Sequence, residues 1–91
     1  MSAVYRVYFT KQATADLENL KAAHLSDKAK KLAQLVSENP YQTPPTYEKL
    51  KGDLSGMYSR RINAKHRFVY MVDEQAQTVK VLSMWSHYEK I

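Results

Sequence analysis

The chain has 91 residues, which fits a single domain spanning 1–91 that buries only a little more than about 60% of its unfolded surface. Its 44% hydrophobic and 25% charged residues are ordinary for a globular protein, and no apolar run approaches the roughly 20 residues that cross a bilayer, which argues against a membrane protein. The sequence has no cysteine and no secretory signal pattern at its start, which excludes disulfides and thiolate zinc sites and predicts a cytoplasmic location.

An excess of basic residues gives the chain a formal net charge of +5. This charge favours a polyanionic partner, because each phosphate that a basic side chain neutralises releases a condensed counterion. Many basic proteins bind no nucleic acid, so the charge alone leaves the function open.

The first half of the chain predicts one strand and a helical hairpin. Residues 4–9 are β-branched and aromatic, which indicates a strand, and Thr10 is expected to cap a helix that runs to about Leu25. A second helix is expected over 27–38, with Ser26 as its cap. The apolar stripes of these helices comprise Ala13, Leu17, Leu20 and His24 in the first and Ala29, Leu32, Leu35 and Val36 in the second.

Charged residues of both helices are expected to face water. They include Asp16 in the first helix and Lys28, Lys30 and Lys31 in the second. The three lysines could contact nucleic acid, but a solvated helix face is the simpler interpretation.

The second half of the chain predicts three strands. Gly52 and Gly56 bracket a tight turn that enters the first of them, since glycine accommodates backbone conformations that strain other residues. Strands are expected over 57–62 and 66–72, joined as a hairpin by a three-residue loop, and over 78–85. In the last strand, Val79, Val81 and Ser83 alternate with Lys80, Leu82 and Met84.

The element order is therefore β-α-α-β-β-β, which predicts a small two-layer α+β fold with the helical hairpin on one face of a mostly antiparallel sheet. The opposite face stays open, and functional side chains belong there. With a three-residue loop, Arg61 stands opposite Arg67 on this face, and facing like charges are destabilising. The pair suggests a bound anion; alternatively, the two arginines splay into solvent or pair with Asp53, Asp73 or Glu74. A loop of two or four residues is equally compatible with the spacing and would change this register.

Four motifs carry a resemblance to a known family. They are Glu48-Lys-Leu-Lys51, Leu54-Ser-Gly-Met-Tyr-Ser-Arg-Arg-Ile62, His66-Arg-Phe-Val-Tyr70 and His87-Tyr88. Together with the order of elements, which extends over almost the whole chain, they resemble the Txe/YoeB group of the RelE-type toxins. The resemblance implies a RelE-like fold and a toxin of a type II toxin-antitoxin pair, which enters the ribosomal A site and cuts messenger RNA there.

The reaction that the resemblance implies is attack of a ribose 2′-hydroxyl on its own 3′-phosphate. Such a reaction requires a base, a cation for the charged phosphorane and an acid for the leaving oxygen. By this resemblance Glu48 is the general base, His87 is the general acid and Arg67 holds the transition-state charge. Histidine suits the acid role, because an imidazole with a pKa of about 6.5 keeps a protonated fraction at neutral pH.

The same resemblance implies contacts to the RNA outside the reacting bonds. Lys51 and Arg61 would grip flanking phosphates, while Tyr88 would contact or orient the RNA near the scissile step. No metal and no cofactor is needed. His66 and Trp85 are assigned to structure rather than to RNA contact.

The implied partners are messenger RNA, the ribosome with its ribosomal RNA, a cognate antitoxin whose acidic, partly disordered tail covers the open face, and a second copy of the chain. Two other functions stay open, namely a non-catalytic toxin on the same scaffold, such as the gyrase-directed toxins, and a plain basic nucleic-acid-binding module. A non-catalytic binder has no reason to hold Glu48, Arg67 and His87 together. We therefore expect a ribosome-dependent endoribonuclease that inhibits translation.

Overall fold

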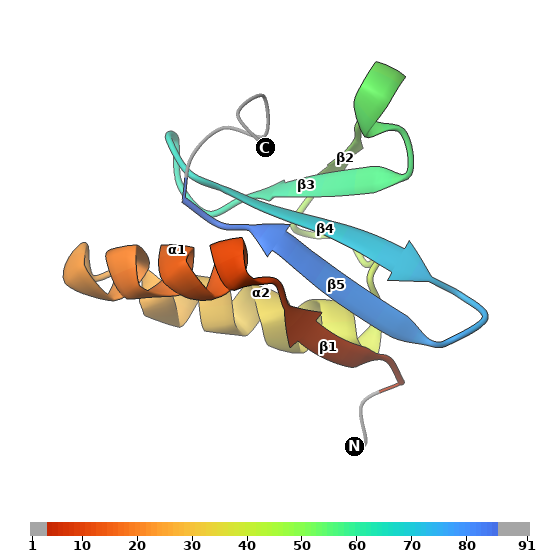
Figure 1. The fold of residues 1–91 in the computed structure, drawn as a ribbon, viewed down its shortest axis with the longest axis horizontal. Helices are drawn as coiled ribbons and strands as arrows, with labels where there is room; N and C mark the ends of the chain where they lie inside the picture. The colour runs from red at the N-terminus through yellow and green to blue at the C-terminus, as the bar shows by residue number, and fades with distance from the viewer. Residues whose placement is uncertain (1–3, 86–91) are drawn as a thin grey trace.

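The computed structural model describes residues 4–85 of the chain. In chain order, its elements are β1 (Arg6–Phe9), α1 (Lys11–Ala22), α2 (Ser26–Glu38), β2 (Tyr47–Lys49), the 3-10 helix η1 (Gly52–Leu54), β3 (Met57–Arg61), β4 (Arg67–Asp73) and β5 (Thr78–Ser83). The strands form one sheet in the order β1-β5-β4-β3-β2, in which β1 lies parallel to β5 and the other neighbours are antiparallel (Figure 1). Both helices cover one face of this sheet, which confirms the two-layer α+β fold and adds β2 to the predicted order.

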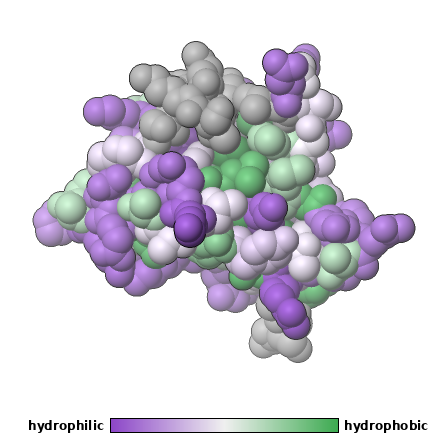
Figure 2. All heavy atoms as spheres, in the orientation of Figure 1, coloured by the Kyte–Doolittle hydropathy of each residue, from purple (hydrophilic) through white to green (hydrophobic). Residues whose placement is uncertain are grey.

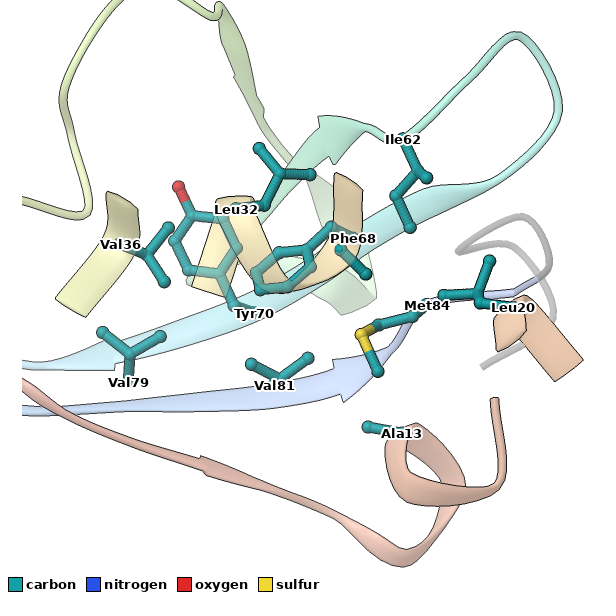
Figure 3. Packing of buried hydrophobic residues seen from close by; sticks show 11 residues of the cluster. Ala13, Leu20, Leu32, Val36, Ile62, Phe68, Tyr70, Val79, Val81 and Met84 are labelled. Atoms are coloured by element: carbon teal, nitrogen blue, oxygen red, sulfur yellow. The ribbon is translucent and has the colours of Figure 1, made fainter. Parts of the chain in front are cut away.

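The hydrophobic core lies between the helices and the sheet (Figure 3). Leu20 of α1, Val36 of α2 and Phe68 of β4 are fully buried here, and burial of each such side chain contributes roughly 1.5–3 kcal/mol. The cluster consists of Ala13, Leu20, Ala29, Leu32, Val36, Ile62, Phe68, Tyr70, Val79, Val81 and Met84. The apolar stripes predicted for the two helices therefore supply one side of the core.

The first helix begins where the sequence predicts and ends earlier. Thr10 Oγ1 accepts a hydrogen bond from the backbone N–H of Ala13 at 3.1 Å, which confirms the predicted N-cap, and donates to the carbonyl of Leu82 at 2.9 Å. The helix ends at Ala22. His24 is exposed and has a φ of 61°, so its predicted place in the apolar stripe is wrong, because this left-handed conformation takes it off the helix.

The second helix starts one residue earlier than predicted. Leu25 occupies the N-cap position and no side chain accepts a hydrogen bond there, so the predicted cap by Ser26 is wrong. Lys28, Lys30 and Lys31 are exposed, as expected for a solvated face. Figure 2 shows hydrophilic residues over most of the outer surface of the helix layer. No helix within residues 4–85 is long and apolar enough to cross a membrane.

The acidic residue Asp16 of α1 is buried, contrary to the predicted helix face. Only 3% of it is exposed; its Oδ2 accepts from the backbone N–H of Met84 at 3.0 Å and its Oδ1 accepts from Gln12 Nε2 at 2.8 Å. The Met84 amide lies just beyond β5, and a buried backbone N–H requires an acceptor. Asp16 supplies it, and α1 is thereby tied to the end of the last strand.

A β-bulge changes which residues of β5 face the helices. The register between β4 and β5 shifts at Leu82, after which Ser83 lies opposite Val69. Because an extra residue reverses the alternation of side chains, Ser83 lies on the helix-free face and Met84 enters the core. The predicted alternation is therefore correct for Val81 and wrong for Ser83 and Met84.

Candidate active site

The β3–β4 hairpin brings two arginines together on the helix-free face of the sheet. Arg61 is the direct cross-strand partner of Arg67, as the three-residue loop predicts. The loop is fixed by Asn63, whose Oδ1 accepts from the backbone N–H groups of Lys65 at 2.8 Å and His66 at 2.7 Å. A turn held by its own side chain in this way sets the register of both strands.

The short strand β2 adds a carboxylate to this pair. It runs antiparallel to β3, and its Glu48 lies opposite Ser59. Arg67 Nη1 donates to Glu48 Oε1 at 2.7 Å, so an ion pair spans from β2 to β4 across β3. Only 18% of the Arg67 side chain is exposed against 58% of that of Glu48, which makes the guanidinium the more enclosed partner. Arg67 thus pairs with a carboxylate, but this partner is Glu48, which was not among the acidic residues that the sequence suggested (Asp53, Asp73 and Glu74).

These side chains line a cavity of about 570 Å³ on the helix-free face. Its walls come from β2, β3, β4 and the segment before β2, and the lining residues are Pro45, Thr46, Tyr47, Glu48, Ser59, Arg61 and Arg67. Arg61 makes no side-chain hydrogen bond or ion pair with any other residue in the range 4–85. The cavity therefore offers an anion two guanidinium groups, and it holds a carboxylate beside one of them.

A second hollow and the distribution of potential metal ligands offer no comparable site among the described residues. A hollow of about 380 Å³ lies over β4 and β5, with Tyr8, Met71 and Lys80 among its lining residues, and it holds no arginine. Within residues 4–85, no three His, Cys, Asp or Glu side chains gather closely enough to hold a metal ion. The cavity of Glu48, Arg61 and Arg67 is therefore the candidate site.

The remaining predicted site residues lie elsewhere. The turn after β2 forms as expected, because Gly52 and Gly56 adopt φ values of 68° and 92° around η1. Lys51 precedes this turn, is exposed and does not line the cavity, so the structure does not bring it to the ion pair. His87 and Tyr88 lie outside the described residues 4–85.

The chain is firmly held where it leaves β5 toward His87. The buried His66 donates from Nδ1–H to the carbonyl of Trp85, and the two rings stack with their centroids 4.0 Å apart and their planes 16° from parallel. Burial, and secondarily the charge of Lys65, lowers the pKa of His66 below its ordinary value, which keeps the ring neutral near pH 7. His66 thus has the structural place expected for it, and it anchors a residue two positions before His87.

The sequence interpretation assigned no role to Arg60, which is fully buried on the helix-covered face. Its guanidinium donates to the carbonyls of Pro45 at 2.6 Å and Pro40 at 2.9 Å and to the Tyr70 hydroxyl at 3.1 Å, and it lies 5.0 Å from the ring centroid of Tyr47. Burial raises the pKa of Tyr70 to about 12, although the charge of Arg60 acts in the opposite direction. Strand alternation is the signal that separates Arg60 from Arg61.

Ser59 is a residue of the site itself to which the sequence interpretation assigned no role. It lines the cavity two residues before Arg61, and only 1% of it is exposed. The same alternation that places Arg61 on the helix-free face also places Ser59 there, so the sequence held the signal.

Comparison with known proteins places the chain in a family. The chain matches the family model of the YoeB-like toxin of bacterial type II toxin-antitoxin systems over residues 9–88. It is 34% identical over 59 residues to the Toxin YoeB of Synechocystis sp., a match that covers 65% of this chain and 66% of that toxin, just under two thirds of its length.

Solved structures agree with this match. The fold is similar to that of the YoeB/ParE toxin from Agrobacterium tumefaciens, with a TM-score of 0.82, 33% identity and coverage of 91% of this chain and 99% of that one. It is also similar to a chain of the YoeB-YefM complex from Staphylococcus aureus, with a TM-score of 0.77, 33% identity and coverage of 92% and 98%. The residues that the family model matches, 9–88, include β2, β3 and β4, which line the cavity. The chain therefore belongs to the YoeB-like toxins of bacterial type II toxin-antitoxin systems.

Proposed function

We propose that this toxin is a ribosome-dependent endoribonuclease that cleaves messenger RNA in the A site and so inhibits translation. The observation that supports this most is the position of the Glu48 carboxylate, 2.7 Å from the Arg67 guanidinium and in the same cavity as Arg61. A purely phosphate-binding surface needs the two arginines but gains nothing from an acidic group that repels phosphate. A cleavage site needs both, since a base must stand next to the cation that stabilises the developing charge.

In the proposed reaction, the 2′-oxygen of a nucleotide forms a bond to its 3′-phosphorus as the bond from phosphorus to the 5′-oxygen of the next nucleotide breaks. Glu48 takes the proton of the 2′-hydroxyl, and His87 gives a proton to the departing 5′-oxygen. The products are a 2′,3′-cyclic phosphate and a 5′-hydroxyl end. Arg67 leaves its ion pair with Glu48 to hold the phosphorane, so the approach of the phosphate frees the base at the same moment.

Substrate contacts extend the proposal beyond the reacting bonds. Arg61 holds a neighbouring phosphate, and Lys51, although outside the cavity lining, holds one further along the strand. Tyr88 orients the RNA near the scissile bond. These roles use charge and hydrogen bonding alone, with no metal or cofactor.

The ribosome enters the proposal because the cavity opens onto the helix-free face of the sheet. Correct alignment of a flexible RNA for in-line attack can supply roughly 7–11 kcal/mol of the barrier, and an open cavity cannot supply all of it. The A site holds messenger RNA in a fixed path, which provides the missing alignment. Action there also makes the cytoplasm the place where the toxin works.

An antitoxin is the second partner that we propose. The S. aureus relative is found as a YoeB-YefM complex. For the present chain, with its formal net charge of +5, an antitoxin with an acidic, partly disordered tail that folds over the helix-free face would cover the arginines. A homodimer, which the resemblance also implies, stays a prediction.

The proposal is tested by comparing cleavage of one messenger RNA on programmed ribosomes with cleavage of the same RNA free in solution. We expect cuts within a few nucleotides of the A-site codon and a rate at least about 100-fold higher on the ribosome. The Glu48→Gln variant, which keeps the side chain's size but removes the base, is the matched control. Equal rates with and without ribosomes, or full activity of Glu48→Gln, would contradict the proposal.

The role of His87 is tested by the pH dependence of single-turnover cleavage. With an imidazole as the acid, the rate falls as pH rises past the imidazole pKa. His87→Gln should slow the reaction and remove this alkaline limb. An alkaline limb that is unchanged in the variant would assign the acid to another group.

A further inference from the structure

A row of small buried residues crosses the helix-free face beneath the candidate site. Ser59 of β3, Val69 of β4 and Ser83 of β5 are direct cross-strand partners in succession. Their exposed fractions are 1%, 0% and 3%. The hydroxyl oxygens of both serines are buried and have no hydrogen-bond partner.

An unpartnered buried hydroxyl is unfavourable for the folded protein. It loses its hydrogen bonds to water and gains none in return, whereas alanine or valine would fill the same position without that penalty. A hydroxyl in this state within a binding cavity is explained most simply by a ligand that supplies the missing bond. Both serines carry such a hydroxyl, but their surroundings differ.

Ser59 lies among the charged groups of the candidate site. Glu48 is its cross-strand partner on one side, and Arg61 follows two residues later on the same face of β3. Side chains separated by two residues on one strand face stand about 7 Å apart, a gap that one phosphate group bridges with its oxygens. A phosphate bound to Arg61 and Arg67 is therefore within reach of the Ser59 hydroxyl.

Ser83 has no such neighbours. It lies two strands away from Ser59, which is roughly 10 Å, and it does not line the cavity. Its buried hydroxyl is otherwise the same as that of Ser59. Ser83 is consequently a matched control, because removing its hydroxyl has the same effect on burial without touching the arginines.

We propose that Ser59 is a further substrate-binding residue, whose hydroxyl donates a hydrogen bond to a non-bridging oxygen of the phosphodiester held by Arg61 and Arg67. This inference rests on the proposed function, since it takes RNA as the source of the phosphate. Parting of the Glu48–Arg67 ion pair by the incoming phosphate opens the way to Ser59. The bond is charge-assisted, which makes it stronger than a hydrogen bond between two neutral groups.

The first test measures single-turnover cleavage on programmed ribosomes for wild type, Ser59→Ala, Ser59→Thr and Ser83→Ala. We expect Ser59→Ala to react about tenfold more slowly, Ser59→Thr to recover most of the rate because it keeps a hydroxyl, and Ser83→Ala to stay within about twofold of wild type. Urea unfolding should show neither alanine variant to be less stable than wild type, since each removes an unsatisfied hydroxyl. Equal rates for wild type and Ser59→Ala, equal loss in both alanine variants, or a loss that parallels reduced stability would overturn the inference.

The second test uses messenger RNA in which sulfur replaces one non-bridging oxygen at the scissile phosphate. Sulfur accepts hydrogen bonds weakly, so one of the two diastereomers should slow wild type about tenfold and should slow Ser59→Ala no further. A merely structural role of Ser59 would leave the effect of sulfur the same in both proteins. That outcome, too, would overturn the inference.

A binding arm separates this inference from the nuclease proposal. The probe is a single-stranded RNA with 2′-O-methyl groups, which cannot react, titrated at low salt by fluorescence anisotropy. If wild type cleaves nothing, the nuclease proposal fails, and the affinity for this probe then tests whether Ser59 contacts RNA. The inference then holds if Ser59→Ala binds the probe several-fold more weakly than Ser83→Ala, and it fails if the two bind alike or if wild type does not bind.

Discussion

Arg60 and Arg61 are adjacent in β3 and have the same side chain, yet one lies in the protein interior and the other in the candidate site. Arg60 is fully buried on the helix-covered face and donates to two carbonyls and one hydroxyl. Arg61 is exposed on the other face, in the candidate site, and makes no side-chain bond with the rest of residues 4–85. One guanidinium is bound at all three of its nitrogens by its own protein, and the other is available to a ligand.

This difference shows that the basic character of the chain is divided between two tasks. Charge counted along the sequence does not separate them, since both arginines contribute equally to the net charge of +5. The two tasks are separated by the face of the strand on which each arginine lies and by the acceptors around its guanidinium. Substitutions in β3 and β4 can therefore be used to break or sharpen the contrast.

The largest effect is expected for Arg60→Ala, and it falls on stability. The change leaves the carbonyls of Pro40 and Pro45 without their donor and creates a cavity beside Tyr70, so the free energy of unfolding should drop by about 3–5 kcal/mol. Arg61→Ala is the control and should stay within about 0.5 kcal/mol of wild type. Urea denaturation measures both, and similar losses for the two variants would remove the distinction between the faces.

Arg67→Ala should act on the chemistry more than on the fold. Loss of one preorganised donor to a charged transition state typically costs roughly 2.7–4 kcal/mol, so single-turnover cleavage on ribosomes should slow by about 100- to 1,000-fold. Its stability should decrease less than that of Arg60→Ala, because the Glu48 partner is mostly exposed. A variant that cleaves at the wild-type rate would exclude Arg67 from the reaction.

Arg61→Ala should have a smaller effect, mainly on RNA binding. A contact to one phosphate contributes a counterion to the salt dependence of binding, so affinity should fall by about tenfold and the salt slope should decrease by about 1. Binding titrations at several salt concentrations check this. An unchanged slope would mean that Arg61 does not contact a phosphate.

The smallest effect concerns Glu74, which does not line the cavity of the candidate site. It accepts hydrogen bonds from the hydroxyls of Tyr5, at 2.8 Å, and Tyr41, and these bonds, that of Tyr41 first, lower the pKa of Glu74 below its ordinary value of 4.5. A carboxyl with a lowered pKa in the folded state stabilises it at all pH values above 4.5, and this contribution is lost as pH falls through the lowered pKa.

Glu74→Gln should therefore be slightly less stable than wild type at neutral pH. The difference should shrink below pH 4.5 and vanish in more acidic solution. Thermal unfolding of both proteins from neutral to acidic pH measures it. A difference that stays constant with pH would show that the hydrogen bonds do not depend on the carboxyl charge.

The sequence predicted the hairpin of the site from two strand patterns joined by Asn63-Ala64-Lys65, with a three-residue loop as the length taken for the register. It therefore placed Arg61 opposite Arg67 correctly. It did not predict β2, since three residues with two charged side chains show no alternation of apolar positions, although charged residues are common on edge strands. The ion pair of Glu48 depends on that strand, so it could not be derived from spacing.

Other differences between the sequence prediction and the structure come from tertiary contacts, which local sequence patterns do not contain. Asp16 is buried because an amide beyond β5 requires an acceptor, and Ser83 changes face because of a bulge in its pairing with β4. Both involve residues far apart in the chain. The roles of His87 and Tyr88 stay predictions, because these residues lie outside the described part of the chain.

The parallel pairing of β1 with β5 determines when the sheet can form during synthesis of the chain. β1 leaves the ribosome early, but its partner residues extend from Thr78 to Val81, near the other end of the chain. Contacts between such distant segments form only after the intervening loop closes, and domains acquire their structure as their residues emerge during synthesis. The sheet therefore closes only after the residues of β5 have been synthesised. A nascent chain that has not yet presented β5 therefore lacks the completed sheet on which Glu48, Arg61 and Arg67 are held together.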